Sequence, residues 1–449
     1  MASKSFLGSI LNLLTPIFKY YPHRQKNSSF CIKAFKNMFI LNNGTVKPCC
    51  LFKTEIKKDG RVMSINEDKV KEIFNSPQMR DIRKRMINGD VVEDCEFCFS
   101  QESKGLWSFR QHYNDGWLKG WQNPDGETLH NLHLYSIENN FHIEPKTIEI
   151  TAGSTCNLKC RSCYSDSSSA IESDKIHSQW APSQSSPFAA SIIRLEQKES
   201  KKLEKLTVLK EILNNPEDFD SILLTGGETL ALKETKAIMS HLVKTGSAEN
   251  TPLFLVTNAT LISQEWCDLA ANFTKLVIMI SIDGVGDLNE YIRYPALWSD
   301  IEAGLEKLKG LSSARLILNP TIQAYNMLNV SEISRYCEKV GIELNSAFPL
   351  EEPKYLSSYS MPLAVRHEAA RRLIKYASSS NVFWKDHLLK IANSWIHAPG
   401  NDPKFIEEFM LFTNDLDVSR HQDFSIACPE LKSMIETSGF KWSQQRKFS

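Results

Sequence analysis

Between residues 146 and 348 the chain repeats one unit, a short apolar run followed by a stretch with helical spacing. The runs are rich in Leu, Ile and Val and lack strict polar–apolar alternation, which is typical of strands covered on both faces. They occupy residues 147–151, 221–226, 252–258, 275–284, 314–324 and 342–348. Strand and helix in repeated succession predict a parallel sheet with helices outside it, an α/β fold of the partial (β/α)6 TIM-barrel type.

Residues 31–113 show a different pattern of short elements. The stretch "NMFILNNGTVKPCC" predicts two strands joined by an Asn-Asn-Gly turn. The stretch "NEDKVKEIFNSPQMRDIRKRMING" has helical spacing that is interrupted at Ser76-Pro77 and stops at Gly89. We therefore expect a small cysteine-rich domain, built of a hairpin and a helix, ahead of the barrel.

The other segments complete the expected organisation. Residues 1–30 form an N-terminal extension, for which a short amphipathic docking helix fits better than a signal peptide. Residues 114–145, rich in Gly, Asn, Trp and His, predict an irregular connector, and residues 146–348 form the barrel. The Ser-rich residues 164–197 are an insertion in it, and residues 349–449 form a helical C-terminal region packed onto it.

Composition and charge narrow the classes of partner. The chain has 449 residues, 42% of them apolar, which is enough for a large core. Lys plus Arg and Asp plus Glu number 53 each. This balance, with no basic aromatic stripe, argues against nucleic acid as a partner. A run of 18 apolar residues is absent from the sequence, so no membrane partner is expected.

Three cysteines gather in "TCNLKCRSCYS", directly after the first predicted barrel strand. A structural zinc site wants four ligands, whereas Cys156, Cys160 and Cys163 supply three. A [4Fe-4S] cluster held by three thiolates leaves one iron open to another ligand. A disulfide between such close cysteines would be strained and would leave one thiol over. The loop therefore favours a cluster with an open iron site.

The loop and the stretch "LLTGGET" after the second strand resemble the radical S-adenosylmethionine (radical SAM) superfamily. The resemblance implies that the open iron binds the amino and carboxylate groups of S-adenosylmethionine. Reductive cleavage then gives a 5′-deoxyadenosyl radical that abstracts hydrogen from a substrate. Gly226, Gly227 and Glu228 are thereby assigned to the methionyl amino group. Many members carry an aromatic residue before the third cysteine; here Ser162 stands there, and Tyr164 becomes a candidate for the adenine.

Further polar residues follow the later strands, where such folds place their chemistry. Ser281 and Asp283 could bond ribose hydroxyls, and Arg293 could meet the methionyl carboxylate as a bidentate partner. Asn258 and Gln323 are additional candidate cofactor contacts. Purely structural roles stay open for two of these residues. Asp283 precedes a glycine and could simply make a turn, and Arg293 could form a surface ion pair.

A second set of cysteines lies in the N-terminal region. Its four predicted ligands close a site, so it is structural or electron-carrying, and spacing leaves zinc and [4Fe-4S] both open. The ligands are Cys31, Cys49, Cys95 and Cys98, with Cys50 as an alternative to Cys49. The stretch resembles the SPASM/twitch region of radical SAM enzymes, which implies a second, auxiliary [4Fe-4S] cluster. In many members that region follows the barrel; here it precedes it.

The leading hypothesis is therefore a radical SAM enzyme. Relatives with auxiliary clusters often modify peptides or proteins, which implies that class of substrate, and flavodoxin or ferredoxin is the implied type of electron donor. The alternative is a non-catalytic binding or scaffold protein stabilised by zinc. Oxygen-labile clusters require a reducing interior, which predicts a cytoplasmic location.

Overall fold

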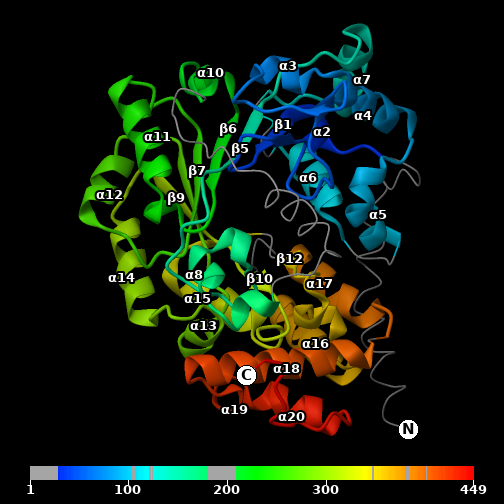
Figure 1. The fold of residues 1–449 in the computed structure, drawn as a ribbon, viewed down its shortest axis with the longest axis vertical. Coiled ribbons are helices and arrows are strands. Elements are labelled where there is room, and N and C mark those ends of the chain that lie inside the picture. The colour runs from blue at the N-terminus through cyan, green and yellow to red at the C-terminus, as the bar shows by residue number, and fades with distance from the viewer. Residues whose placement is uncertain are drawn as a thin grey trace.

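The computed structural model describes most of the chain and is drawn in Figure 1. The described residues are 29–103, 107–120, 123, 125–180, 209–345, 348–379, 385–400 and 402–448. Residues 1–28 of the predicted N-terminal extension lie outside them, as does the second half of the Ser-rich insertion, residues 181–197. In that insertion the structure describes the short helix α8 (Ser169–Glu172).

A parallel sheet forms the centre of the molecule, as the apolar runs predict. Its strands are β5 (Thr147–Thr151), β6 (Ser221–Thr225), β7 (Leu253–Thr257), β8 (Leu276–Ile280), β9 (Ala314–Leu318) and β11 (Glu343–Leu344). They pair in parallel in that order, each with the next. The run expected at 314–324 is divided, because Pro320 has no N–H for the ladder. Its second part, β10 (Thr321–Ile322), pairs instead with β12 (Phe348–Pro349).

Helices of the barrel cover one face of this sheet (Figure 1). They are α10 (Lys210–Leu213), α11 (Lys233–Lys244), α12 (Gln264–Ala270), α13 (Asp287–Ile292), α14 (Trp298–Lys309) and α15 (Val330–Val340). Helix α15 begins after Asn329 and ends at Gly341, whose φ of 71° closes the last turn. This alternation of strand and helix confirms the predicted fold class.

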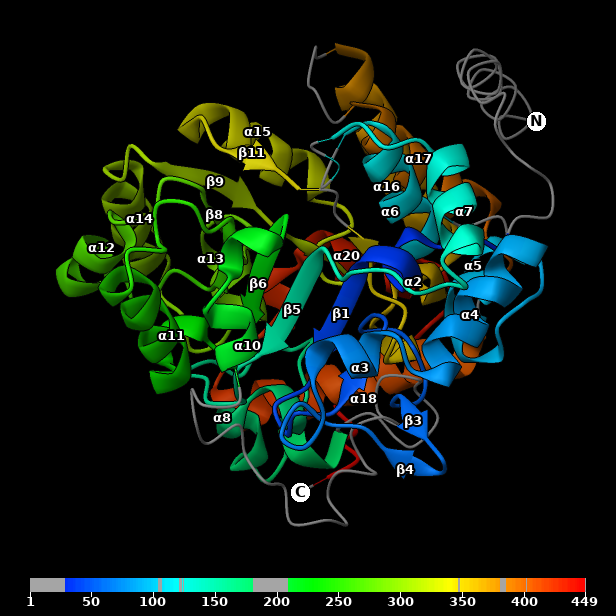
Figure 2. The same cartoon turned by 90° about the horizontal axis from the view of Figure 1, so that it is seen from above.

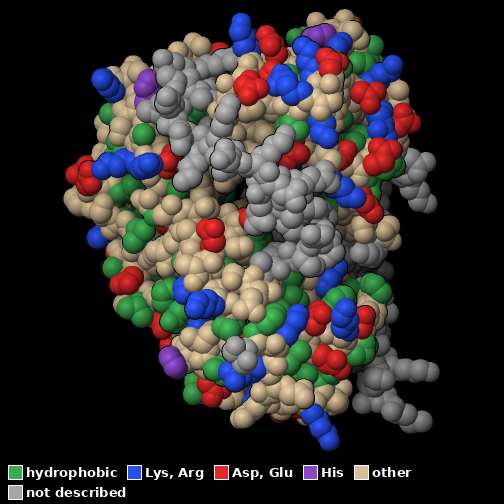
Figure 3. Space-filling view, viewed as in Figure 1, with side chains coloured by type: hydrophobic (Ala, Val, Ile, Leu, Met, Phe, Trp, Pro, Cys, Tyr) green, Lys and Arg blue, Asp and Glu red, His purple; other side chains and the backbone are tan. Residues whose placement is uncertain are grey.

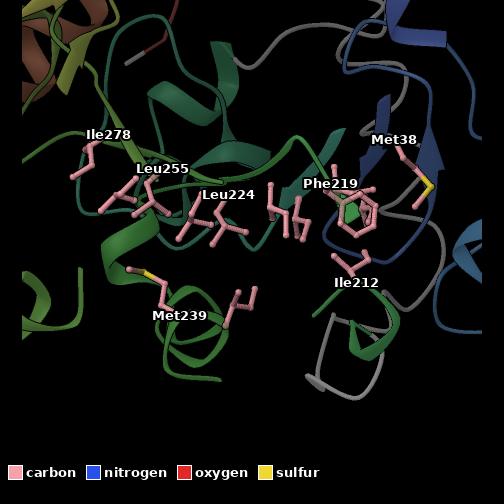
Figure 4. Close-up of a cluster of buried hydrophobic side chains, with 14 of the residues drawn as sticks. Met38, Ile212, Phe219, Leu224, Met239, Leu255 and Ile278 are labelled. Carbon is pink, nitrogen blue, oxygen red and sulfur yellow. The ribbon is translucent and has the colours of Figure 1, made fainter. Parts of the chain in front are cut away.

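The apolar core lies between the sheet and these helices. Leu224, Leu255 and Ile278 are fully buried and face Met239 of α11 (Figure 4). The alternate positions on the other face, such as Phe254 in β7, are only half-buried. The two faces of the sheet therefore differ in burial, whereas the sequence predicts strands that are covered equally on both faces. A closed barrel fills its interior with side chains, whereas a partial barrel leaves that face accessible.

The N-terminal region continues the sheet and does not stand apart from it (Figure 2). Strand β1 (Asn37–Ile40) pairs in parallel with β5 and in antiparallel with β2 (Val46–Lys47), which gives the predicted hairpin and eight strands in all. Helix α4 (Pro77–Asn88) is capped by Ser76 and ended by Gly89 at φ 86°, as its sequence predicts. The region also contains α2 (Ile32–Lys36), β3 (Lys57–Lys58), β4 (Arg61–Val62), α3 (Val70–Phe74) and α5 (Glu96–Ser103).

The expectation of an irregular connector over residues 114–145 is wrong. Helix α6 (Phe109–Leu118) enters this segment and α7 (Leu129–Glu138) lies within it. Ser108 and Gln111 form a reciprocal capping box at the start of α6. The Ser-x-x-Gln capping signal is visible in the sequence. The many Gly, Asn and Trp residues nevertheless favoured the prediction of an irregular segment.

The C-terminal region is helical, as predicted, and occupies the lower part of Figure 1. Its helices are α16 (Leu363–Ser379), α17 (Lys385–His397), α18 (Pro403–Arg420), α19 (Phe424–Ala427) and α20 (Pro429–Thr437). They share one apolar cluster with Tyr291 and Ile322 of the barrel, so the region is packed onto the barrel.

The described helices include none with the length and apolar character needed to cross a bilayer. On the face shown in Figure 3, basic and acidic side chains are intermixed and not gathered by sign. This surface agrees with the equal numbers of basic and acidic residues in the sequence.

Candidate active site

The carboxyl ends of the parallel strands meet at one edge of the sheet, and the predicted site residues follow these ends. The cysteine loop comes after β5, the Gly-Gly-Glu stretch after β6, and the remaining candidates after β7, β8 and β10. Residues distant in sequence are thereby brought to one edge, as this architecture requires.

Backbone hydrogen bonds tie the cysteine loop to the segment that follows α13. The N–H of Lys159 donates to the carbonyl of Tyr294 at 2.6 Å. The N–H of Arg161 donates to the carbonyl of Ile292 at 2.8 Å. The stretch between the first and third cysteines is therefore held by the segment that leads to Arg293.

Two glycines allow the turn after β6 to pack against the cysteine loop. Gly226 has φ 147°, and a Cβ there would lie 2.5 Å from the carbonyl oxygen of Gly153. A Cβ on Gly227 would lie 2.3 Å from the carbonyl oxygen of Thr155. The N–H of Gly227 donates to Gly153 at 2.9 Å. The close approach that these glycines permit is thus an approach to the cysteine loop itself.

Glu228 is 1% exposed, and its carboxylate links β6 to β7. It accepts from the hydroxyl of Thr257 at 2.6 Å and from the N–H of Asn258 at 2.7 Å. Burial raises the pKa of Glu228, and these hydrogen bonds lower it. The side chain of Asn258 in turn donates to Asn157 in the cysteine loop at 2.9 Å. Both predicted residues therefore join the strand ends to the loop.

Asp283 and Arg293 are paired with each other beside a cysteine. Arg293 Nε donates to Asp283 at 2.9 Å, and its Nη1 lies 3.7 Å from Cys160 Sγ. The other oxygen of Asp283 accepts from the N–H of Thr321 at 2.7 Å, and Asp283 is fully buried. This geometry makes Asp283 the residue that holds Arg293 against the thiol. Contacts of either residue with ribose or methionyl carboxylate stay predictions.

Gln323 is fully buried, and neither its amide oxygen nor its amide nitrogen has a hydrogen-bond partner among the described residues. Ser281, at the end of β8, is half-buried, and its N–H donates to the carbonyl of Thr257 at 2.8 Å. Tyr164 is also half-buried; burial raises its pKa well above the usual value, and the charge of Cys163 adds to this. The cofactor contacts predicted for these residues stay predictions.

The three thiols of the loop lie within electrostatic reach of one another. Burial raises the pKa of Cys163 to about 12, and the charges of Cys160 and Cys156 contribute to the rise. Burial raises the pKa of Cys160 to about 11, although the neighbouring Arg293 lowers it. Each thiol is uncrosslinked. A guanidinium facing Cys160 favours the thiolate, which is the form that binds metal.

Sequence reasoning missed Arg161, which lies inside the cysteine loop and is fully buried. Its Nη2 donates to Asp417 at 2.5 Å and to Gln422 at 2.9 Å, at the end of α18. Its position between two predicted ligands was a usable signal. Asp417 lies more than 250 residues further along the chain, and the sequence contained no sign of that contact.

The four predicted N-terminal ligands gather in a second group. Burial raises the pKa of Cys95, and the charges of Cys49 and Cys31 raise it further. The same causes, in the same order, raise the pKa of Cys98. The N–H of Lys53 donates to the carbonyl of Asp94 at 3.2 Å, which ties the two segments together.

Helix α6 supports this second group. Asn114 accepts from the N–H of Ile32 at 2.8 Å and donates to the carbonyl of Phe30 at 2.8 Å. These two bonds fix the backbone on both sides of Cys31. A residue from the segment expected to be an irregular connector thus positions a predicted ligand.

Cys50 and Cys49 differ in the charges that influence their pKa most strongly. Burial raises the pKa of Cys50, and after Cys49 the next contribution comes from Glu149 on β5. Lys33 forms a buried ion pair with Glu149, and its Nζ lies 4.0 Å from the centre of the Tyr113 ring. The charge of Cys49, and not that of Cys50, is among the main influences on the pKa of Cys95 and of Cys98. This arrangement favours Cys49 as the fourth ligand.

The donor sets fit the groups that the sequence implies. Within the described residues, no three His, Cys, Asp or Glu side chains are placed to hold one metal ion together. An iron–sulfur cluster makes a different demand, because each thiolate bonds a separate iron. Three free, mutually interacting thiols beside a guanidinium suit an anionic cluster with one open iron, and four suit a closed one.

Residues 150–322 match the family model described as the Radical SAM superfamily, and residues 31–99 match one described as an iron-sulfur cluster-binding domain. The chain therefore contains a radical SAM domain and an iron-sulfur cluster-binding domain. The radical SAM match begins in β5 and contains the cysteine loop, the Gly-Gly-Glu stretch and the later strand ends. The second match contains Cys31, Cys49, Cys95 and Cys98.

Individual relatives of this radical SAM chain are distant. A curated protein of Danio rerio, "RNA transcription, translation and transport factor protein", is 26% identical over 113 residues, which are 25% of this chain. The matched region is 47% of that relative, so the chain spans about half its length.

Two solved structures are similar at low identity. SuiB of Streptococcus suis bound to S-adenosylmethionine has a TM-score of 0.38 and 13% identity, over 60% of this chain and 58% of SuiB. Native anSMEcpe with bound AdoMet has a TM-score of 0.37 and 21% identity, over 52% of this chain and 60% of that one.

Proposed function

We propose that the chain reductively cleaves S-adenosylmethionine and uses the resulting radical to abstract hydrogen from a peptide or protein. The observation that carries this proposal is the contact between the two motifs. Gly226 and Gly227 pack on the loop of Cys156, Cys160 and Cys163, within the residues that match the radical SAM family. A [4Fe-4S] cluster bound there would supply the electron for the cleavage.

The chain's own residues would divide the remaining work. Cys156, Cys160 and Cys163 hold the cluster and leave one iron open. Arg293, fixed by Asp283 at 2.9 Å, places positive charge beside Cys160. Buried Gln323 presents an unpaired amide donor and acceptor, which suits a polar ligand such as S-adenosylmethionine. Glu228, Asn258, Ser281 and Tyr164 are the further proposed contacts.

The four-thiol group is the proposed auxiliary site, with a second [4Fe-4S] cluster on Cys31, Cys49, Cys95 and Cys98. We place this unit at residues 31–113, the barrel at 146–348 and the helical region at 349–449. The peptide or protein substrate and a flavodoxin-like or ferredoxin-like electron donor rest on the family resemblance. A cytoplasmic location follows from the oxygen sensitivity of such clusters.

Anaerobic reconstitution followed by S-adenosylmethionine and dithionite tests the proposal. We expect 5′-deoxyadenosine and methionine in the wild-type protein and neither in Cys160→Ala. We also expect about eight irons per chain, the content of two [4Fe-4S] clusters. Zinc in place of iron, with no cleavage products, would instead support the zinc-stabilised scaffold.

A further inference from the structure

Two buried guanidinium groups lie behind the cysteine loop. Arg161 is fully buried in the loop, and Arg420, the last residue of α18, is 4% exposed. Arg161 donates to Asp417 of α18 at 2.5 Å, and Arg420 follows Asp417 by three residues in the same helix, so both guanidinium groups lie at this end of α18. Neither residue belongs to the predicted ligands or cofactor contacts.

Arg161 is only partly satisfied. Its Nε donates to the carbonyl of Tyr291 at 3.0 Å, and its guanidinium lies 3.8 Å from the centre of that ring. Its Nη2 donates to Asp417 and Gln422, whereas its Nη1 is buried without a hydrogen-bond partner. Asp417 is therefore the carboxylate that pairs with this cation.

The guanidinium of Arg420 has fewer hydrogen-bond partners than that of Arg161. Its Nη2 lies 2.8 Å from Nδ1 of His177, and its Nε and Nη1 are buried without hydrogen-bond partners. Burial, and then the charge of Arg420, hold the pKa of His177 far below its usual range, so the imidazole is neutral and accepts the bond. Among the described residues, no carboxylate forms an ion pair with Arg420. The nearby Asp174 pairs with Lys159 at 3.2 Å.

An unpaired buried cation is costly and persists where something compensates it. The guanidinium of Arg420 lies 5.2 Å from the centre of the Tyr294 ring. The carbonyl of Tyr294 accepts from the N–H of Lys159, the residue before Cys160, at 2.6 Å. The charge of Asp174 favours protonated Arg420, and the cysteine loop lies beside this cation as well. Arg420 of α18, a helix far away in the sequence, would thus be the counter-charge of a negative centre bound by this loop.

We propose that Arg420, supported by Arg161, stabilises the more negative, one-electron-reduced state of the centre on Cys156, Cys160 and Cys163, and that Asp417 limits this effect. The inference rests on the proposed function, because it requires a cluster on these cysteines. The step adds one electron from an external reductant and moves no proton at these arginines. The C-terminal helices thereby set the reduction potential of the centre.

Redox titration of the full-length, anaerobically reconstituted protein with dithionite tests this, using the electron paramagnetic resonance signal that is absent in Cys160→Ala. Arg420→Gln should shift the ratio of reduced to oxidised centre about tenfold toward oxidised at a fixed potential, which is about 59 mV for one electron. Arg420→Lys, which keeps the charge, should titrate like the wild type. Asp417→Asn should shift the midpoint in the opposite direction.

Arg366→Gln is the matched control. Arg366 is 1% exposed, lies in α16, donates to the carbonyl of Ala398 at 3.0 Å and also has a buried Nε without a partner. Its loss should leave the midpoint unchanged. An unshifted midpoint in Arg420→Gln, or equal shifts in both glutamine variants, would overturn the inference. If Arg420→Gln does not fold, the opposite shift in Asp417→Asn decides, and its absence overturns the inference. A wild-type protein without any cluster signal would instead refute the proposed function.

Discussion

The two cysteine groups are held by different parts of the fold. The four-thiol group is held by its own region, through contacts such as those of Asn114 and the bond from Lys53 to Asp94. The three-thiol loop depends on distant segments: the glycines after β6, Arg293 after α13 and Asp417 in α18. The four thiols are thus held largely within one region, although Gln101 of α5 also donates to Glu351 at 2.6 Å, whereas the three-thiol loop is assembled from several segments of the barrel and from α18.

Their electrostatic surroundings differ as well. Arg293 and Arg420 lower the pKa of Cys160 and so favour its thiolate. Cys95 feels the charges of Cys49, Cys31 and Cys98, all of which raise its pKa further. External positive charge acts on Cys160 in the loop, and on Cys31 in the four-thiol group through Arg110 and Lys33, whereas the main influences on Cys95 come from its fellow ligands.

Replacing one thiol in each group should separate the two sites, with the largest effect in the loop. Cys160→Ala should reduce S-adenosylmethionine cleavage to background and remove about four of the irons, the content of one cluster. Cleavage products and iron content measure both effects. Retained cleavage in this variant would show that the loop is not the reactive centre.

Substitution of the adjacent residues Cys49 and Cys50 should have unequal effects on the iron content. Cys49→Ala should lose about four irons, since the closed [4Fe-4S] cluster proposed at this site is held by all four of its thiolates. Cys50→Ala should keep them, because the charge of Cys49, and not that of Cys50, is among the main influences on Cys95 and Cys98. Iron and sulfide analysis of both variants checks this. The reverse pattern would make Cys50 the ligand.

Distant support of the loop can be tested without removing a ligand. Gly227→Ala places a Cβ 2.3 Å from the backbone of Thr155 and must displace the loop. A displacement near 1 Å should lower the cleavage rate about 100-fold. The iron of the four-thiol group should be unaffected.

Gly400→Ala is the control for that variant, because a Cβ there meets nothing within 4 Å. Its cleavage rate and iron content should equal those of the wild type. Equal rates in Gly227→Ala and Gly400→Ala would contradict the contact between the two motifs.

Lowering the pH should reduce the stability of the protein through His112 in α6, the helix that supports the N-terminal cysteines. This effect is smaller than those of the preceding substitutions. Burial, and then the charge of His387, lower the pKa of His112 in α6 to about 3. The unfolded chain therefore binds this proton more readily, and stability falls as pH drops from about 6.5 toward 3. At pH 5 this histidine alone should cost about 2 kcal/mol of the free energy of unfolding.

Urea unfolding at pH 7 and pH 5 measures this cost. His112→Gln should lose less stability than the wild type between the two pH values, by about the same 2 kcal/mol. Equal losses in the two proteins would show that His112 is not the group that titrates.

Much of the fold could be predicted because its signals are local. The β-branched runs predict strands, Ser76-Pro77 and Gly89 mark the ends of α4, and the three-then-two cysteine spacing marks the loop. The helix α6 was missed because its composition resembles that of a turn-rich segment, although Ser108 and Gln111 carry a capping signal. The order of strands along the chain was enough to bring the candidate residues to one edge.

The sequence by itself determined which atoms are available for chemistry: three thiols in one loop, four in another, and polar residues after each strand. Tertiary structure decided which of them meet. Asp283 pairs with Arg293, Asn114 of α6 binds the backbone on both sides of Cys31, and α18 brings Asp417 and Arg420 to the cysteine loop. Spacing along a chain specifies local geometry, but contacts across more than 250 residues depend on how apolar faces pack, which no short motif encodes.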